Sequence, residues 1–136
     1  MKQEEKELLL KDLCARLSYG VKVKVTPVPS EEYNHIFFNG KIVCIDTDYI
    51  GVLSDNGFVL QQDIIELKPY LFPLSNMTEE QEIEYDATFD TIVYEDGRKD
   101  SVMTYKSFDW LNANHFDYRG LIEKGLANDA TGLNIY

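Results

Sequence analysis

The chain has 136 residues, a formal net charge of −11 and a hydrophobic content of 44%, of which aromatic residues make up a substantial part. This size and composition support a single folding unit with a conventional core and argue against a disordered chain. The negative charge repels phosphate backbones and anionic lipids, so direct nucleic-acid binding is disfavoured; it favours a basic partner or solubility alone.

The sequence predicts a cytoplasmic protein. Its charged start is followed by only three consecutive leucines, too few for the apolar core of a signal peptide, and no apolar run approaches the roughly 20 residues that span a bilayer. Cys14 and Cys44 are the only cysteines and lie among apolar residues, which favours buried, reduced thiols over a disulfide. We therefore expect neither secretion nor membrane association.

Residues 1–20 are predicted to form one amphipathic helix. Its apolar positions Leu10, Leu13, Cys14 and Leu17 recur at helical spacing, and Gly20 is placed to end the helix in a left-handed conformation. We expect this helix to cover an open end of the sheet that follows.

Residues 21–72 read as short strands separated by turns. Asn39-Gly40 and Asp55-Asn56-Gly57 favour hairpin turns, Asp63–Glu66 favours a brief helical turn, and Pro27 and Pro29 lead into a loop that extends to Asn34. The predicted strands are Val21–Val25, His35–Phe38, Lys41–Asp46, Tyr49–Ser54, Phe58–Gln61 and Leu67–Phe72.

The order of these elements resembles the SH3-like small β-barrel, from Val21 to about Phe72. The common order is a strand, a long first loop, a meander, a helical turn and a closing strand. The acidic and aromatic residues with which signalling SH3 domains bind proline-rich peptides are missing, so their specificity is not carried over. The resemblance implies an α+β fold built on such a barrel.

Residues 73–127 are predicted as a mixed α/β extension. Thr78 and Gln81 form a capping-box pattern that starts a helix at Glu79. Thr91–Tyr94 and Lys99–Tyr105 then read as a second hairpin around Asp96-Gly97.

A C-terminal helical pair is predicted next. Ser107 can cap a helix that carries Phe108 and Leu111, and Asp117 can cap another that carries Leu121 and Leu126. The tail over residues 128–136 offers little to anchor it, so we expect it to be mobile.

Three segments resemble a set of uncharacterised small proteins of gut anaerobes and their prophage-like elements. They are Asp109–Ala127, Lys6–Leu17 and Lys68-Pro69-Tyr70-Leu71; residues 79–105 do not match. The resemblance implies a phage or mobile-element accessory protein, and it brings no activity, cofactor or site residue with it.

Motifs for catalysis or metal binding are weak. Asp46-Thr47-Asp48 superficially resembles a calcium loop, but Ile50 and Gly57 occupy positions where that loop needs oxygen ligands. His35 and His115 lie outside any zinc motif, and a nucleophile pair of Cys14 with either histidine has no support from spacing. We therefore predict no enzyme, no cofactor and no metal.

The strongest charge feature is the stretch from Glu79 to Asp100. Nine acids stand there against Arg98 and Lys99, a net charge of −7. The stretch is either a solvated face or a charge array that imitates DNA phosphates.

The candidate interaction residues are Trp110, His115, Tyr118 and Arg119, near Phe116. Large amphipathic side chains with a cation are enriched at binding hot spots, although Trp110 and Phe116 could equally form core. The sequence thus predicts a non-enzymatic protein-interaction module of unknown partner and oligomeric state, with an acidic DNA-mimic inhibitor as the alternative.

Overall fold

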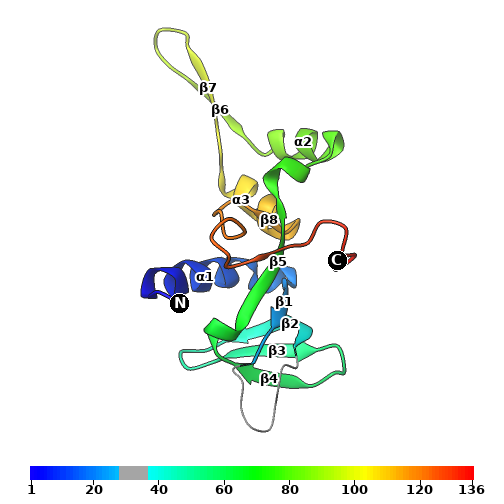
Figure 1. Ribbon diagram of the computed structural model, residues 1–136. Coiled ribbons are helices and arrows are strands. Elements are labelled where there is room, and N and C mark those ends of the chain that lie inside the picture. The colour runs from blue at the N-terminus through cyan, green and yellow to red at the C-terminus, as the bar shows by residue number, and fades with distance from the viewer. Residues whose placement is uncertain (28–36) are drawn as a thin grey trace.

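The computed structural model describes residues 1–27 and 37–136, and within them the fold is α+β, as predicted (Figure 1). The helices are α1 (Gln3–Arg16), α2 (Glu79–Asp86) and α3 (Tyr105–Ala113), with 3-10 turns η1 (Leu17–Tyr19), η2 (Ile64–Glu66) and η3 (Leu74–Asn76). The strands are β1 (Lys22–Val25), β2 (Phe38–Ile45), β3 (Ile50–Ser54), β4 (Val59–Gln62), β5 (Leu67–Pro73), β6 (Asp90–Val93), β7 (Lys99–Val102), β8 (Phe116–Asp117) and β9 (Asn128–Asp129). None of the helices in these ranges has the length and apolar character needed to cross a membrane.

The main sheet is open and has the order β4-β3-β2-β1-β5-β8, with β9 also paired to β5. Strands β1 to β5 pair in antiparallel fashion, whereas β8 and β9 pair with β5 in parallel. The peptide between Leu71 and Phe72 accepts from the Ala130 N–H through its C=O and donates to the His115 carbonyl through its N–H, so β9 and β8 lie on opposite edges of β5. Among the described residues β4 pairs only with β3, so the sheet does not close on β5. The SH3-like barrel predicted for residues 21–72 is therefore not confirmed.

The predicted turn at Asn39-Gly40 is wrong, because β2 runs straight through it. Gly40 lies opposite Val23 of β1 and Ser54 of β3. A Cβ there would come within 2.5 Å of Val52 Cγ1 and 2.7 Å of the Leu53 carbonyl oxygen. Glycine is therefore needed at this position because β3 lies too close to β2 for a side chain. His35, in the strand expected before this turn, and the loop before it lie outside the described residues.

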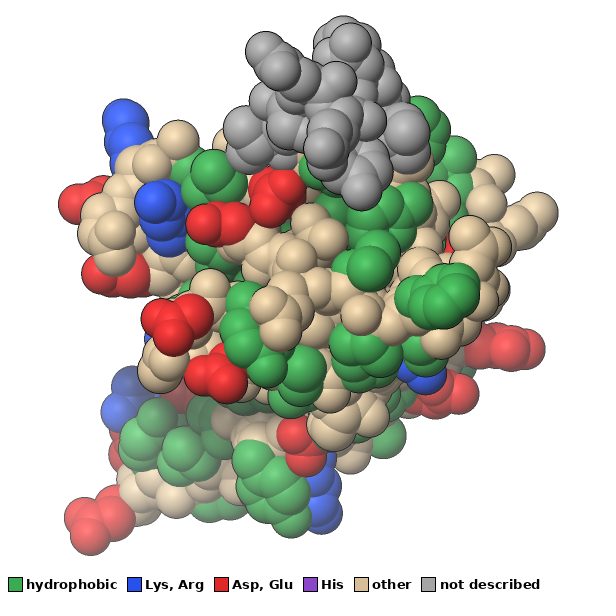
Figure 2. Space-filling model, turned by 90° about the horizontal axis from the view of Figure 1, so that it is seen from below, with side chains coloured by type: hydrophobic (Ala, Val, Ile, Leu, Met, Phe, Trp, Pro, Cys, Tyr) green, Lys and Arg blue, Asp and Glu red, His purple; other side chains and the backbone are tan. Residues whose placement is uncertain are grey.

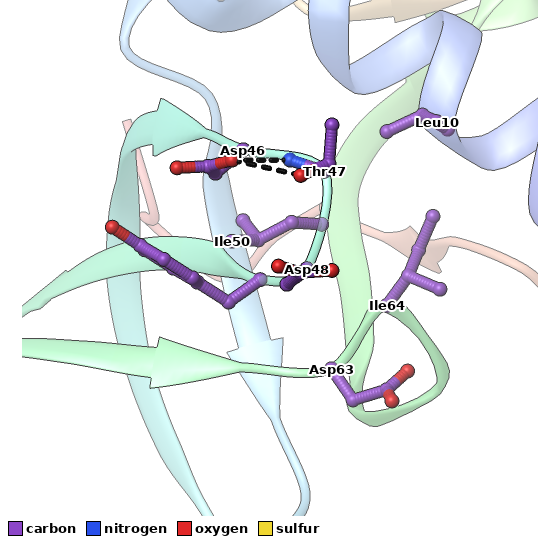
Figure 3. A pocket seen from close by; sticks show the side chains of 8 residues that line it. Leu10, Asp46, Thr47, Asp48, Ile50, Asp63 and Ile64 are labelled. Carbon is purple, nitrogen blue, oxygen red and sulfur yellow. Dashed lines mark hydrogen bonds between the residues drawn. The ribbon is translucent and has the colours of Figure 1, made fainter.

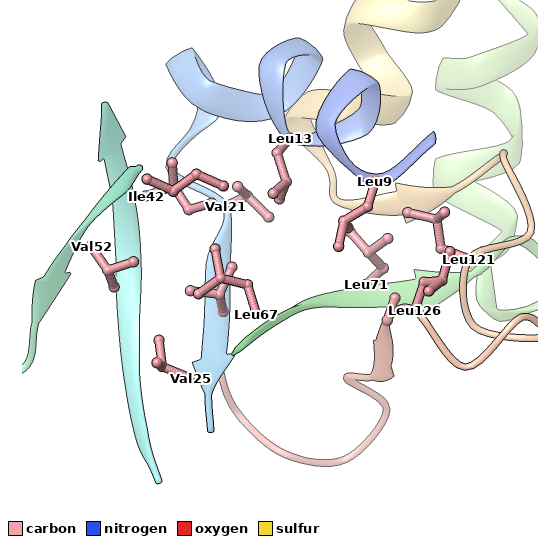
Figure 4. Close-up of a cluster of buried hydrophobic side chains, with 13 residues drawn as sticks. Leu9, Leu13, Val21, Val25, Ile42, Val52, Leu67, Leu71, Leu121 and Leu126 are labelled. Atoms are coloured by element: carbon pink, nitrogen blue, oxygen red, sulfur yellow. The ribbon is translucent and has the colours of Figure 1, made fainter. Parts of the chain in front are cut away.

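The predicted face of α1 is only partly right: Leu13 is buried and Leu17 packs against the core, but Leu10 and Cys14 are exposed. Leu9 and Leu13 are buried and contribute to the core together with residues of β1, β2, β3 and β5 and with Leu121 and Leu126 (Figure 4). Cys14 and Cys44 are free but exposed, so the expectation that both thiols are buried is wrong.

Gly20 ends the N-terminal helical segment as expected, with a φ of 68°. The turns at Asp55-Asn56-Gly57 and the helical turn before β5 are also confirmed. These positions share one property, a local backbone or capping requirement that few residue types can meet.

The predicted C-terminal helical pair is confirmed only for its first helix, which carries Phe108 and Leu111. The first helix, α3, is capped by Thr104, and Ser107 lies inside it. Residues 118–127 form turns in place of the second helix, because Gly120 and Gly125 both have a φ of 72°. The Asp117 carboxylate still accepts bonds from the backbone N–H groups of Leu121 and Ile122, as a cap would.

The tail over residues 128–136 is anchored, contrary to the expected mobility. Besides the pairing of β9 with β5, the Lys22 N–H donates to the Tyr136 hydroxyl at 2.9 Å. The Tyr136 hydroxyl donates to the Tyr70 carbonyl at 2.7 Å. Burial raises the pKa of this phenol to about 12, although the hydrogen bond from the Lys22 N–H acts in the opposite direction.

The capping box and the second hairpin are confirmed in the region after β5. Thr78 Oγ1 accepts from the Gln81 N–H, and the Gln81 side chain accepts from the Thr78 N–H. Strands β6 and β7 pair only with each other in the described structure and project away from the sheet (Figure 1). We call residues 79–102, which comprise α2 and this hairpin, the acidic arm.

Candidate functional site

A buried ionic network joins α1 to the C-terminal segment. The Asp12 carboxylate accepts from Arg16 Nε and from Arg119 Nη1, each at 2.8 Å. The side chains of Asp12 and Arg16 are fully buried, and Arg16 Nη2 donates to the Phe116 carbonyl at 2.6 Å. Two arginines share one carboxylate, so the network carries a net positive charge inside the protein.

Two of the predicted interaction residues, Tyr118 and Arg119, belong to this network. Arg119 Nη1 donates to the Tyr118 hydroxyl at 2.7 Å, and that hydroxyl donates to Asn112 Oδ1 of α3 at 2.9 Å. The guanidinium groups of Arg16 and Arg119 also lie near the Tyr118 ring. Both side chains therefore have internal partners.

Trp110 lies at the root of the acidic arm. Its ring stacks on Phe116 with centroids 5.6 Å apart, and it contacts Tyr85 of α2 at 5.5 Å. Its Nε1–H donates to Glu84 at 3.2 Å. Trp110, a residue of α3, thus packs against both α2 and β8. This agrees with the core-packing role that the sequence also allows for it.

His115, the fourth predicted residue, has a φ of 62° and stacks on Tyr136 with centroids 3.6 Å apart. Its pKa is lowered to about 4, chiefly by desolvation and in addition by the nearby charges of Arg16 and Lys22. Its imidazole is therefore neutral at physiological pH.

The structure brings all four predicted residues into one region, where each contacts the protein's own side chains. Tyr118 also lines a surface cavity of about 470 Å³ with residues of β5 and of the turn after it. A role for these four residues in partner binding stays a prediction.

The acidic arm is the most exposed part of the described chain. All nine of its acidic residues are exposed, as is every residue from Asp90 to Ser101. Ile92 lies opposite Asp100 and Val93 opposite Lys99, so the two aliphatic side chains point to opposite faces of the hairpin. Since both are exposed, neither face of the hairpin packs on the body of the protein.

Polar contacts tie the two ends of the hairpin together. Thr104 Oγ1 donates to the Thr88 carbonyl at 2.9 Å, and Thr88 Oγ1 donates to Ser107 Oγ at 2.8 Å. Ser107 is fully buried. Sequence reasoning missed this clamp because isolated threonines and serines resemble helix caps, and only the fold brings them together.

A cavity of about 180 Å³ lies beside the turn from Asp46 to Tyr49 (Figure 3). It is lined by this turn, by Asp63 and Ile64, and by Leu10 of α1. Asp46 Oδ1 accepts from the Thr47 N–H at 2.6 Å and from its hydroxyl, so this carboxylate serves its own turn. Within the described residues no group of three or more potential ligands could hold a metal ion.

No protein-family model matches the chain, and no match is found among curated proteins or solved structures.

We predict that Asp12→Asn lowers the free energy of unfolding by about 3 kcal/mol or more, because Arg16 is then left buried without a counter-charge. Urea denaturation measures the change. The control is Glu7→Gln on the exposed side of the same helix, which we expect to stay within about 0.5 kcal/mol of the parent. Equal small effects for both variants would show that the network does not stabilise the fold.

We also predict an acid-dependent loss of stability that comes from His115. Above pH 6.5 the imidazole is neutral in both states; between pH 6.5 and about 4 only the unfolded chain takes up the proton, so the free energy of unfolding falls. The full shift corresponds to about 3 kcal/mol, and because the ring is partly exposed, screening by solvent reduces the expected loss to about 2 kcal/mol. His115→Asn, which tolerates the positive φ, should remove this part of the pH dependence, as measured by denaturation at several pH values. Parallel pH profiles for the two proteins would contradict the assignment.

Proposed function

We propose that this protein is a non-enzymatic protein-interaction module that contacts its partner through the acidic arm. The main observation in support is that the hairpin of β6 and β7 projects from the body with both faces exposed (Figure 1). An isolated two-stranded hairpin is at best marginally stable in water and gains stability when another surface covers it. Ile92, Val93 and Tyr94 supply exposed apolar area for such a surface.

The partner we propose has a basic surface. The arm carries a net charge of −7, and its acids lie exposed on both α2 and the hairpin. Complementary charge accelerates association and excludes acidic competitors, while the apolar side chains between the acids supply contact area. The residues at the root of the arm, including Trp110, would then position it and not form the contact.

A second candidate function is inhibition of a DNA-binding protein by charge mimicry. The exposure of all nine acids in the arm supports it, since a mimic must present carboxylates where DNA presents phosphates. In that case the basic surface of the partner is its DNA site, and duplex DNA competes with the arm.

We further propose a cytoplasmic location, where the two exposed thiols would remain reduced. The sequence resemblance to small proteins of prophage-like elements supports an accessory role in such an element.

The test is affinity capture from a host lysate at about 0.1 M and about 1 M salt, followed by a binding titration with the purified partner. We predict that Ile92→Ser with Val93→Ser weakens binding about tenfold or more. The control is Ile65→Ser in η2, where isoleucine is exposed to a similar extent (45%, against 42% for Ile92), and we expect it to bind like the parent.

Equal binding by the hairpin variant and the control would overturn the arm as the contact surface. Charge mimicry makes a separate prediction, because the variant carrying Asp90→Asn, Glu95→Gln, Asp96→Asn and Asp100→Asn should then lose binding and DNA should displace the parent. Weakened binding without competition by DNA would support the interaction module and exclude the mimic. Binding that the four substitutions leave unchanged would contradict both the mimic and the proposed basic surface of the partner.

A further inference from the structure

In the part of the chain that the structure describes, strand β4 is an unpaired edge of the main sheet. Within the described residues it pairs only with β3, and natural edge strands usually carry a charge, a proline or a bulge that prevents further pairing. β4 has none of these, and the seven residues from Asn56 to Gln62 are all uncharged. Phe58, Val59 and Leu60 are exposed, and the face seen from this end shows hydrophobic and uncharged groups with acids around them (Figure 2).

The backbone of β4 has a defined free edge. The Ser54 N–H donates to the Phe58 carbonyl at 2.8 Å, which fixes the alternation of the ladder between β3 and β4. In that register Leu60 and Gln62 also direct their backbone groups toward β3. The N–H and C=O groups of Val59 and Gln61 therefore point away from β3 and out of the sheet.

This pattern is self-complementary about Leu60. If two copies pair antiparallel with Leu60 opposite Leu60, Val59 of each lies opposite Gln61 of the other. Both are outward-facing residues, so the two pairs form about four backbone hydrogen bonds. Leu60 then occupies a pair without hydrogen bonds, where opposing side chains lie closest, and Phe58 lies on the same face of the sheet.

The self-complementary register, and not the net charge, favours a second copy as the occupant. Each chain carries −11, which opposes self-association over most of the surface. The uncharged strip of β4 is a place where two copies can meet, and the twofold register sets Asp63 opposite Gly57, so no acid faces an acid. A basic partner would instead be drawn to the acidic arm.

We infer that β4 is a homodimer interface, through which two copies form one continuous antiparallel sheet about a twofold axis at Leu60. The inference is independent of the proposed function, because the arm lies outside the main sheet.

Sedimentation equilibrium of the full chain, from micromolar to sub-millimolar concentration, tests it. We predict a monomer–dimer equilibrium that strengthens as salt screens the repulsion between the chains, the opposite of the trend expected for the arm. Leu60→Lys should weaken dimerisation about tenfold or more, since it sets two like charges directly opposite each other.

Two further variants sharpen the test. Val43→Lys in β2 is the matched control, because Val43 and Leu60 are both 39% exposed, and it should dimerise like the parent. Val59→Pro removes an N–H that points out of the sheet without removing a bond to β3, so it should weaken the dimer while the circular dichroism spectrum stays that of the parent.

A chain that stays monomeric at the highest concentration and salt would overturn the inference. A dimer that is insensitive to both Leu60→Lys and Val59→Pro would overturn it too, since the interface would then lie elsewhere. Binding of a different chain that Leu60→Lys abolishes, with no dimer, would assign this edge to a partner and would likewise contradict the proposal.

Discussion

The buried Asp12 carboxylate is the constraint on which the rest of the structure depends. It bonds to Arg16 one turn along α1 and to Arg119 more than a hundred residues later, while Arg16 reaches the Phe116 carbonyl. Burying these charges costs solvation free energy that their mutual attraction offsets only while all partners are in place, so the loss of one partner leaves an uncompensated buried charge. The network fixes which face of α1 turns inward and therefore places Leu9 and Leu13 in the core.

Strand β5 connects this ionic network to the sheet, because it pairs with the strands on either side of Arg119 in the sequence. It pairs with β1 along its first half and with β8 and β9, on opposite edges, along its second half, so the C-terminal segment that holds Arg119 is fixed on the sheet. Phe116 of β8 stacks on Trp110, which in turn contacts α2. The body thus holds the root of the acidic arm firmly and leaves the hairpin exposed. The protein combines a packed body with a projecting, charged element.

The sequence predicted the features that have a local cause. The Thr78 and Gln81 capping box, the turn at Gly57 and the left-handed Gly20 need only near neighbours. It failed where distant groups decide the outcome. The observed face of α1 has the same helical spacing as the predicted one, but it includes the charged residues Asp12 and Arg16, and only the fold reveals that Asp12 meets Arg119. Gly40 looks like a turn residue until Val52 is seen beside it, and Tyr136 looks unanchored until it meets Tyr70. The candidate residues at 110–119 were found as a group, yet their internal partners were not predictable from their spacing.

Amide hydrogen exchange of the free, full-length chain tests the central claim, a packed body bearing an exposed arm, most directly. Local opening is easiest where backbone hydrogen bonds are exposed and few apolar groups are buried. We expect the amides of β6 and β7 to exchange fast, while those of β5 and its partners β1 and β8 exchange only on global unfolding. Protection of the hairpin equal to that of β5 would contradict the account, because the arm would then be part of the packed body.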